Sequence, residues 1–270
     1  MGISSHLGGA ERSLLDFIKY YRKQSPSSSV SVLLPNDNGP LCAKLKNLNI
    51  ETHTLPMPTS FYNASREHFL SSSFQALLAM PQFVFYLYKL SRFIKQHNIT
   101  KIHSTGLKCH LILSLISIHY PGQIILHFRD ILRSTSLKKF FLLYKRKRNL
   151  VWLANSKATA ESLQPISAKV IFNGIDIQVF QPKRNRYLRD QFDLSDKTQL
   201  IGHLGVLARW KGQKEFLMAL PKVISIFPHC HAFIIGDQIY ETSGDPSYLM
   251  ELKSLVEKLK LLKQLLLTLK

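Results

Sequence analysis

Short apolar runs alternate with longer segments of helical periodicity along most of the chain. The apolar runs have the length of buried strands, and turn-forming residues follow most of them. They predict eight strands, at residues 30–34, 50–55, 101–104, 123–127, 150–154, 169–172, 200–205 and 231–236.

The segments between these strands repeat apolar residues every three or four positions, which is typical of amphipathic helices. The predicted helices cover residues 10–21, 41–48, 71–96, 107–119, 136–144, 157–163 and 213–227, and another starts near Ser247. Regular alternation of strands and helices predicts an α/β fold whose parallel sheets are covered by helices on both faces.

One polar, basic stretch, residues 183–198, contains few apolar side chains and interrupts the alternation. We interpret it as a linker. The chain is therefore predicted to form two domains, residues 1–182 and residues 199–270.

Ligands of open α/β sheets bind at the carboxyl ends of the strands, so the residues just beyond the predicted strands are candidate site residues. These candidates are Gly8 and Gly9, His127 to Arg129, Asn155 and Ser156, Asn173 and Gly174, Arg209 to Lys211, and Gly236 and Asp237.

The most basic of these positions lies in residues 201–213, where a strand leads through a short turn into a helix. In an extended segment, side chains two residues apart point the same way. Arg209 and Lys211 would then direct two cations to one point before a helix amino end, which suits a phosphate. The alternative is a solvated basic turn.

Composition limits the partners and the compartment. The 270 residues carry a net charge of +19, which favours sugar nucleotides, nucleic acid or an acidic membrane surface. The three cysteines show no zinc-site spacing, which indicates a reducing, cytoplasmic location. The amino end lacks the pattern of a signal peptide, and no uncharged apolar run is long enough to predict a membrane span.

Six stretches carry a family resemblance by their order and spacing. They are LGGAERSLLDF (7–17), HFRD (127–130), LANSKATAESL (153–163), VIFNGIDIQVFQP (170–182), ARWKGQKEF (208–216) and IIGD (234–237). Together they resemble the retaining, nucleotide-sugar-dependent glycosyltransferase family 4. The resemblance implies a GT-B-like fold, with an amino-terminal acceptor domain and a carboxy-terminal donor domain, each Rossmann-like with a parallel sheet.

The resemblance also implies roles for individual residues. His127 corresponds to a catalytic-site histidine near the sugar, and Lys211 to the lysine that contacts the donor phosphate. Residues implied in donor binding also include Gly8, Gly9, Arg209, Gly236 and Asp237, and residues implied in lining the cleft are Asn155, Ser156, Asn173 and Gly174. Glycine at 8 and 9 is expected to permit positive φ and close backbone approach. Neither a metal ion nor another cofactor is implied, because the nucleotide-sugar is a substrate.

Three features depart from the family pattern. Val206 stands where the family has an arginine. The strand that precedes the Gly8-Gly9 loop in the family is missing, so the helix over residues 10–21 is expected to lack part of its packing surface. Residues 259–270 form a leucine- and lysine-rich tail of helical pattern, in place of the βα units that carry paired glutamates. We therefore expect a truncated chain with an incomplete second domain, in which only two strands are recognisable.

The predicted function is transfer of a sugar from a nucleotide-sugar donor to a glycan or lipid-linked acceptor, retaining and metal-independent, in polysaccharide or cell-envelope synthesis. The alternative is an inactive remnant of such an enzyme. Binding to nucleic acid is not expected, because no zinc spacing, RNA-binding strand motif or basic zipper is present. The basic and aromatic segments 83–95 and 138–148 are candidates for peripheral contact with an anionic membrane at its inner face.

Overall fold

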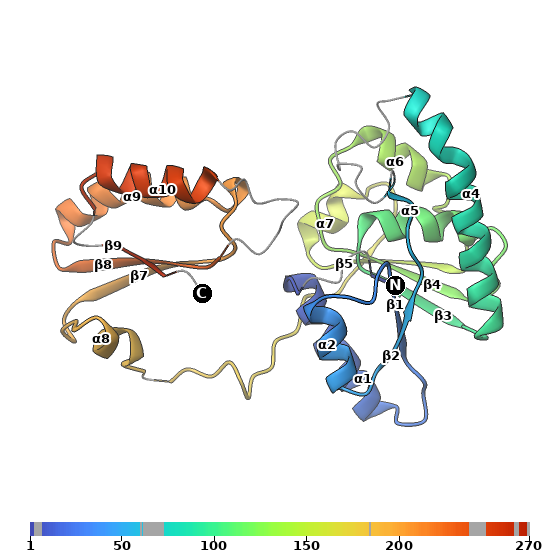
Figure 1. Ribbon diagram of the computed structural model, residues 1–270, viewed down its shortest axis with the longest axis horizontal. Coiled ribbons are helices and arrows are strands. Elements are labelled where there is room, and N and C mark those ends of the chain that lie inside the picture. The colour runs from blue at the N-terminus through green and yellow to red at the C-terminus, as the bar shows by residue number, and fades with distance from the viewer. Residues whose placement is uncertain are drawn as a thin grey trace. The chain divides into compact units, whose positions relative to one another are not determined.

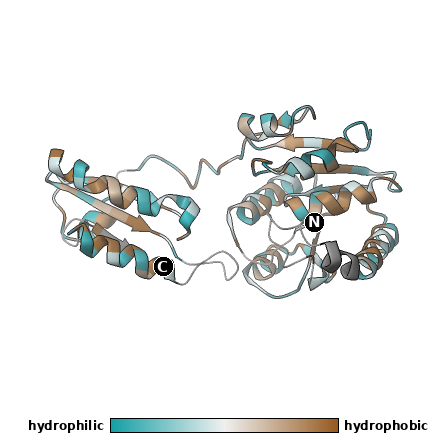
Figure 2. Cartoon of the chain, turned by 90° about the horizontal axis from the view of Figure 1, so that it is seen from above, coloured by the Kyte–Doolittle hydropathy of each residue, from teal (hydrophilic) through white to brown (hydrophobic). Residues whose placement is uncertain are grey.

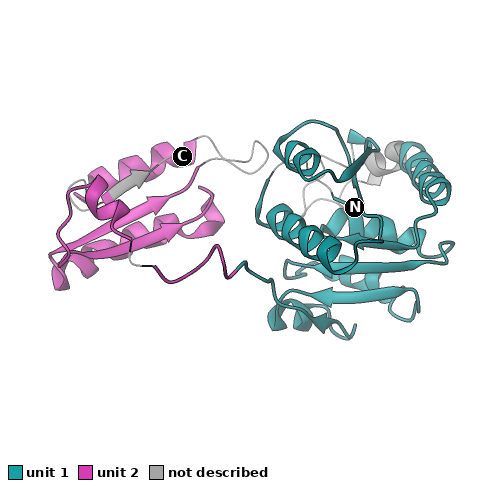
Figure 3. Ribbon diagram, turned by 90° about the horizontal axis from the view of Figure 1, so that it is seen from below, with its two compact units in different colours: residues 1–176 teal, residues 177–270 magenta. Residues whose placement is uncertain are grey.

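The chain folds into two α/β units, Met1–Asp176 (unit 1) and Ile177–Lys270 (unit 2), which are distinguished in Figure 3. This computed structural model describes residues 1–2, 7–59, 61, 73–183, 185–237, 247–261 and 265–268. Every strand pair in the described residues is parallel, as the alternation of strands and helices predicted.

The larger sheet of unit 1 has the strand order β3-β4-β5-β6 (Figure 1). Its strands are Lys101–Ser104, Gln123–Phe128, Leu150–Ala154 and Lys169–Val170. The helices that pack with it are α4 (Ser73–Gln96), α5 (Leu107–Ile116), α6 (Thr135–Leu142) and α7 (Lys157–Ser162). Fully buried aliphatic and aromatic side chains from both layers, such as Ile112, Leu126 and Phe141, form the core of this sheet.

A second, two-stranded sheet in unit 1 pairs β1 (Ser31–Leu34) with β2 (Glu51–Thr54). Helices α1 (Gly9–Gln24) and α2 (Pro40–Asn47) pack with it around a separate core. The Met1 amino group donates to the His103 carbonyl at 2.7 Å, and the Gly2 amide donates to the Leu33 carbonyl at 3.0 Å. The first two residues therefore hydrogen-bond to a strand of each sheet.

Helix α1 buries Leu15 and Ile18 in this small core. The strands β1 and β2 and helix α2 supply the packing surface for this face. The expectation that α1 lacks part of its packing surface stays a prediction. The apolar face predicted from the spacing of residues 10–21 is the face that α1 packs in this core, with Leu15 and Ile18 buried.

Unit 2 has the strand order β7-β8-β9, formed by Gln199–Leu204, Cys230–Ile235 and Leu265–Thr268. Helices α9 (Gln213–Ile226) and α10 (Ser247–Lys258) lie side by side on one face of this sheet (Figure 1). The expectation of two strands and a helical tail is therefore wrong. Part of the tail, β9, pairs with β8 from Ala232–Leu265 to Ile235–Thr268, so the tertiary partner overrides the helical pattern.

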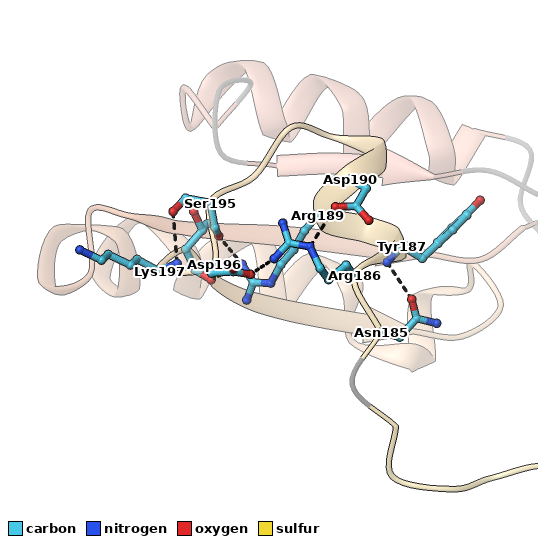
Figure 4. Close-up of polar contacts among 9 residues, drawn as sticks. Asn185, Arg186, Tyr187, Arg189, Asp190, Ser195, Asp196 and Lys197 are labelled. Carbon is cyan, nitrogen blue, oxygen red and sulfur yellow. Dashed lines mark hydrogen bonds and ion pairs between the residues drawn. The ribbon is translucent and has the colours of Figure 1, made fainter.

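The stretch predicted as a linker contains a short helix, α8 (Tyr187–Gln191), and it belongs to unit 2. Figure 4 shows the polar contacts that hold it. Arg186 Nε donates to Asp190 Oδ1 at 3.1 Å and the same side chain pairs with Asp196, while Arg189 Nη1 donates to the Thr198 carbonyl at 2.9 Å. Charged residues thus help to organise this stretch, and the centre of the Phe192 ring lies 5.5 Å from that of the Phe233 ring of β8.

The helices carry both hydrophobic and hydrophilic residues, as Figure 2 shows, which fits one face packed on a sheet and one in solvent. Within the described residues, no helix has the length and apolar character needed to cross a membrane.

Candidate functional site

In unit 2, the carboxyl ends of β7 and β8 form a closely packed edge. A Cβ atom at Gly236 would lie 1.9 Å from the Gly205 carbonyl oxygen, so only glycine fits there. The Gly205 amide donates to the Ile235 carbonyl at 3.0 Å, and the Leu207 amide donates to the Asp237 carbonyl at 3.1 Å. Gly236 and the Asp237 backbone therefore continue the strand pairing into the loop after β7.

That loop ends in a single turn of 3₁₀-helix, η1 (Arg209–Lys211), followed by Gly212 and α9. Gly212 has φ 82°, in the left-handed region that glycine favours, and it occupies the N-cap position of α9. The amino end of α9 has no side-chain cap. Backbone N–H groups at such an end, together with the helix dipole, attract anions.

Lys211 is the free cation beside this helix end. Its side chain is exposed and makes no hydrogen bond or ion pair with any residue that the structure describes. A hydrogen bond from the His203 ring holds the Lys211 backbone in place, since the Lys211 carbonyl oxygen lies 2.9 Å from His203 Nε2. A fixed backbone with an unpaired ammonium group suits a phosphate ligand.

Arg209 does not join Lys211 in the way predicted. The prediction assumed an extended segment, but η1 has about three residues per turn, so side chains two apart leave the helix about 120° apart. Arg209 instead pairs with Glu251 of α10 and lies over the Tyr248 ring, 5.0 Å from its centroid. Glu251 also accepts from Lys214 Nζ at 3.1 Å. These ion pairs depress the pKa of the Glu251 carboxyl, with Arg209 the larger cause.

Two residues that the sequence did not single out hold this loop. Gln213 is fully buried, and its Nε2 donates to the Val206 carbonyl at 2.8 Å. His203 holds the Lys211 carbonyl, as described above. Val206, at the position where an arginine was expected, thus contributes its backbone to the loop. Both residues, His203 and Gln213, lie within residues 201–213. Nothing in their spacing distinguishes them from ordinary polar positions.

In unit 1, three histidines gather around the carboxyl ends of β3 and β4. His127 Nδ1 lies 3.3 Å from His103 Nε2, and His110 Nδ1 lies 2.7 Å from Ser104 Oγ. The His127 side chain is only 8% exposed, and its Nε2 atom is buried without a hydrogen-bond partner. His127 therefore presents one unused ring nitrogen, while the other is oriented by His103.

The electrostatic setting keeps these histidines neutral. Burial, and then the positive charge of Arg129, lower the pKa of His127 to about 4. Burial is also the main cause that lowers the pKa of His103 to about 3, with the Met1 amino group and His127 as smaller causes. At neutral pH His127 can donate or accept a hydrogen bond, but it supplies no positive charge.

Gly8 and Gly9 lie where α1 begins. Gly8 is the N-cap, with φ −88° and ψ −172°, and its amide donates to Glu11 Oε2 at 3.1 Å. A Cβ at Gly9 would meet nothing within 4 Å, and neither glycine has a positive φ. The predicted positive φ is therefore wrong at both positions. The role of these residues in donor binding stays a prediction.

Arg129, one of the candidates at the strand ends, directly follows β4. Its guanidinium is half-buried, and its Nε has no hydrogen-bond partner. Burial lowers the pKa of Arg129, and the charge of Glu11 from the first turn of α1 opposes that change. The carboxyl end of β4, which carries His127, and the amino end of α1 therefore interact electrostatically, through Arg129 and Glu11.

The remaining predicted residues support the fold around this strand end. Asn155 Nδ2 donates to the Arg129 carbonyl at 3.3 Å, and Asn155 Oδ1 accepts from Thr159 Oγ1 at 3.0 Å. Ser156 caps α7, with its Oγ 3.1 Å from the Thr159 amide nitrogen. Asn173 and Gly174 are exposed near the end of unit 1. Their part in lining a cleft stays a prediction.

Within the described chain, no group of three or more histidine, cysteine, aspartate or glutamate side chains has an arrangement that could hold a metal ion. The predicted site residues thus fall into two separate sets. His127, Asn155 and Ser156 gather in unit 1, and Lys211, Gly236 and Asp237 gather in unit 2.

The arrangement of the sheets can be compared with solved structures. HepE from Anabaena, in complex with UDP, superposes with a TM-score of 0.74 at 21% identity, over 99% of this chain and 67% of that one. The chain has the GT-B fold. The GT-B likeness extends to a glycosyltransferase from Rickettsia africae, with a TM-score of 0.68 at 16% identity over 100% of this chain and 66% of that one.

A third GT-B structure is sucrose-phosphate synthase from Thermosynechococcus elongatus, with a TM-score of 0.63 and 13% identity over 98% of this chain and 66% of that one. The chain thus spans about two thirds of the length of these structures. No protein-family model matches the chain, and no curated protein matches its sequence.

Proposed function

We propose that this GT-B chain acts in glycosyl transfer, as a retaining enzyme of the family 4 type. The donor is a nucleotide-sugar and the acceptor is a hydroxyl of a glycan or of a lipid-linked sugar. In the transfer, the bond between the anomeric carbon and the diphosphate breaks and a glycosidic bond forms. The acceptor hydroxyl loses its proton, and a nucleoside diphosphate leaves with the bonding electrons.

The observation that carries the proposal is Lys211, which is exposed and has no ion-pair partner among the described residues, beside the amino end of α9, which has no side-chain cap. A departing diphosphate gains negative charge in the transition state, and a fixed ammonium group with oriented N–H groups stabilises that charge. The UDP bound to HepE, a structure with the same fold, supports a nucleoside diphosphate as the probe.

His127 has a different part in the proposal. Because its pKa lies near 4, it is neutral and does not stabilise the diphosphate. Its Nε2 is buried without a hydrogen-bond partner among the described residues, and its contact with His103 fixes the ring orientation. We assign it to sugar positioning, with no metal ion in the mechanism.

The first experiment measures binding of UDP to the full chain by isothermal titration calorimetry. Lys211→Ala should raise the Kd about tenfold or more, because a charge-assisted hydrogen bond to phosphate is lost. Lys222→Ala is the matched control, since Lys222 is exposed on the same helix away from its amino end. Equal losses in both variants would show that Lys211 has no specific role.

The second experiment measures turnover with a panel of nucleotide-sugars and sugar acceptors, with and without EDTA. Turnover that survives EDTA and falls in Lys211→Ala supports a metal-independent transferase. UDP binding without turnover supports the alternative, a non-catalytic chain of this fold. In that alternative the Arg209–Glu251 pair has removed one cation from the phosphate site. Failure to bind any nucleoside diphosphate would overturn the proposed transferase activity.

A cytoplasmic location, with peripheral contact at the inner face of an anionic membrane, completes the proposal. It fits the net charge of +19 and a lipid-linked acceptor.

A further inference from the structure

Helix α4 (Ser73–Gln96) has one face in the core of unit 1 and one face without a partner. Tyr86, Leu90 and Ile94 are buried, with Phe83 and Phe93 partly buried beside them. This is the spacing of a single helix face that packs on a sheet. The other face, which begins at Met80 in the part of α4 whose side chains are described, remains in solvent.

Large apolar side chains occupy this solvent face. They are Met80, Val84, Phe85 and Tyr88, each between 51% and 59% exposed. Their spacing of three to four residues places Val84, Phe85 and Tyr88 on neighbouring turns of one surface. Single exposed apolar residues are ordinary, but a contiguous patch marks an interaction surface.

The charges next to this patch have one sign. Lys89, Arg92 and Lys95 continue the exposed face toward the helix end, and Lys89 Nζ lies 4.5 Å from the centre of the Phe85 ring. None of the three forms a salt bridge with a described residue. The sequence contains no aspartate or glutamate from residue 68 to residue 129, a stretch with six lysines and arginines.

We propose that the exposed face of α4 binds the surface of an anionic lipid bilayer, with Phe85 and Tyr88 in the interface and Arg92 and Lys95 on lipid phosphates. Aromatic rings favour the boundary between headgroups and acyl chains, and long basic side chains reach the phosphates above it. A polyanion such as nucleic acid would use the cations, but it would not require the apolar stripe. A purely apolar partner would not require a stretch of sequence without aspartate or glutamate. A charged interface over an apolar layer uses both.

This inference rests on the membrane contact of the proposed function and assigns that contact to one surface of unit 1. Its test measures binding to lipid, so it can fail while UDP binding and turnover hold. The full chain is mixed with vesicles of phosphatidylcholine, or of phosphatidylcholine with roughly 30% phosphatidylglycerol, and the bound fraction is measured by flotation. Binding is expected to the phosphatidylglycerol vesicles and to weaken between 0.05 and roughly 0.5 M salt. Absence of binding by the unaltered chain at low salt would overturn the proposal.

The charge arm compares two double variants with the same change in net charge. R92E/K95E reverses two cations of the α4 face, and K23E/K44E reverses two exposed cations near β1 and β2. R92E/K95E should lower the vesicle partition coefficient by more than tenfold, at about fivefold for each cation removed. K23E/K44E should change it by less than about threefold, through the weaker long-range field alone. Equal losses would show that the net charge, and not this face, attracts the lipid.

The aromatic arm compares Tyr88→Ser with Tyr20→Ser, two tyrosines that are 59% and 52% exposed on different helices. Tyr88→Ser should lower partitioning on the order of fivefold, because the ring no longer enters the interface, and Tyr20→Ser should have no effect. All variants are checked by circular dichroism for retained folding. If Tyr88→Ser leaves lipid binding unchanged, or if heparin binds as tightly as lipid and competes fully, the surface is a polyanion site and the proposal is wrong.

Discussion

Replacement of Gly236 by alanine tests the close approach that shapes the candidate phosphate loop. The new Cβ would lie 1.9 Å from the Gly205 carbonyl oxygen, whereas Cβ contacts below 3.0 Å essentially do not occur. The two backbones must therefore separate by about 1.1 Å. That movement breaks the flanking hydrogen bonds Gly205–Ile235 and Leu207–Asp237, which are 3.0 and 3.1 Å long.

The magnitude follows from these losses. Two backbone hydrogen bonds contribute about 1 kcal/mol each, and the remaining overlap adds 1 kcal/mol or more, so unit 2 should lose about 3 kcal/mol. Amide hydrogen exchange measured by mass spectrometry reports the loss locally. Peptides over β7 and β8 should exchange about a hundredfold faster, since about 1.4 kcal/mol corresponds to a factor of ten. Peptides over β4 and β5 serve as the internal reference.

Gly174→Ala is the matched control, because its Cβ would meet nothing within 4 Å and its φ is not positive. It should leave exchange unchanged in both units. If Gly236→Ala exchanges within about threefold of the unaltered chain, the loop tolerates a side chain, and the reasoning from close backbone approach is refuted.

Three further predictions concern charge and capping. The pKa values of His127 and His103 are about 4 and about 3 in the folded chain, against about 6.5 in the unfolded chain, so the unfolded chain takes up protons first as the pH falls. The contribution of these histidines to the unfolding free energy of unit 1 should therefore be fully present above about pH 6.5 and fall as the pH approaches 4. Urea titrations at pH 7 and pH 5 should show this fall, and a smaller fall in His103→Asn. Glu251→Gln should leave the urea unfolding midpoint almost unchanged, since its ion pairs are exposed, yet tighten UDP binding about twofold by removing the carboxylate that pairs with Arg209; weaker binding would contradict this. Ser156→Ala should cost unit 1 about 1 kcal/mol in urea unfolding through loss of the α7 cap, whereas Ser156→Thr should keep most of it.

The sequence alone determined the order of the elements and the edge at which candidate residues gather. Strand–helix alternation predicted parallel sheets, and the helix over residues 71–96 is observed as α4 with its apolar face in the core. Ser156 follows the strand over residues 150–154, and its side chain caps the next helix. These features were predictable because burial on one face of a helix or strand leaves a period in the sequence, and caps depend on residues three apart.

Tertiary structure decided the features that depend on distant partners. The tail beyond residue 259 has a helical pattern, yet β9 forms because β8 offers it a parallel partner. Arg209 was expected beside Lys211, but the turn is helical and Glu251, more than forty residues later, holds the guanidinium. Gly236 is required by a carbonyl of residue 205, and His127 is oriented by His103 of a neighbouring strand. A periodic pattern records which face of an element is buried. It does not record which distant atom will lie within 3 Å, because that is set by how the backbones meet after the elements have packed.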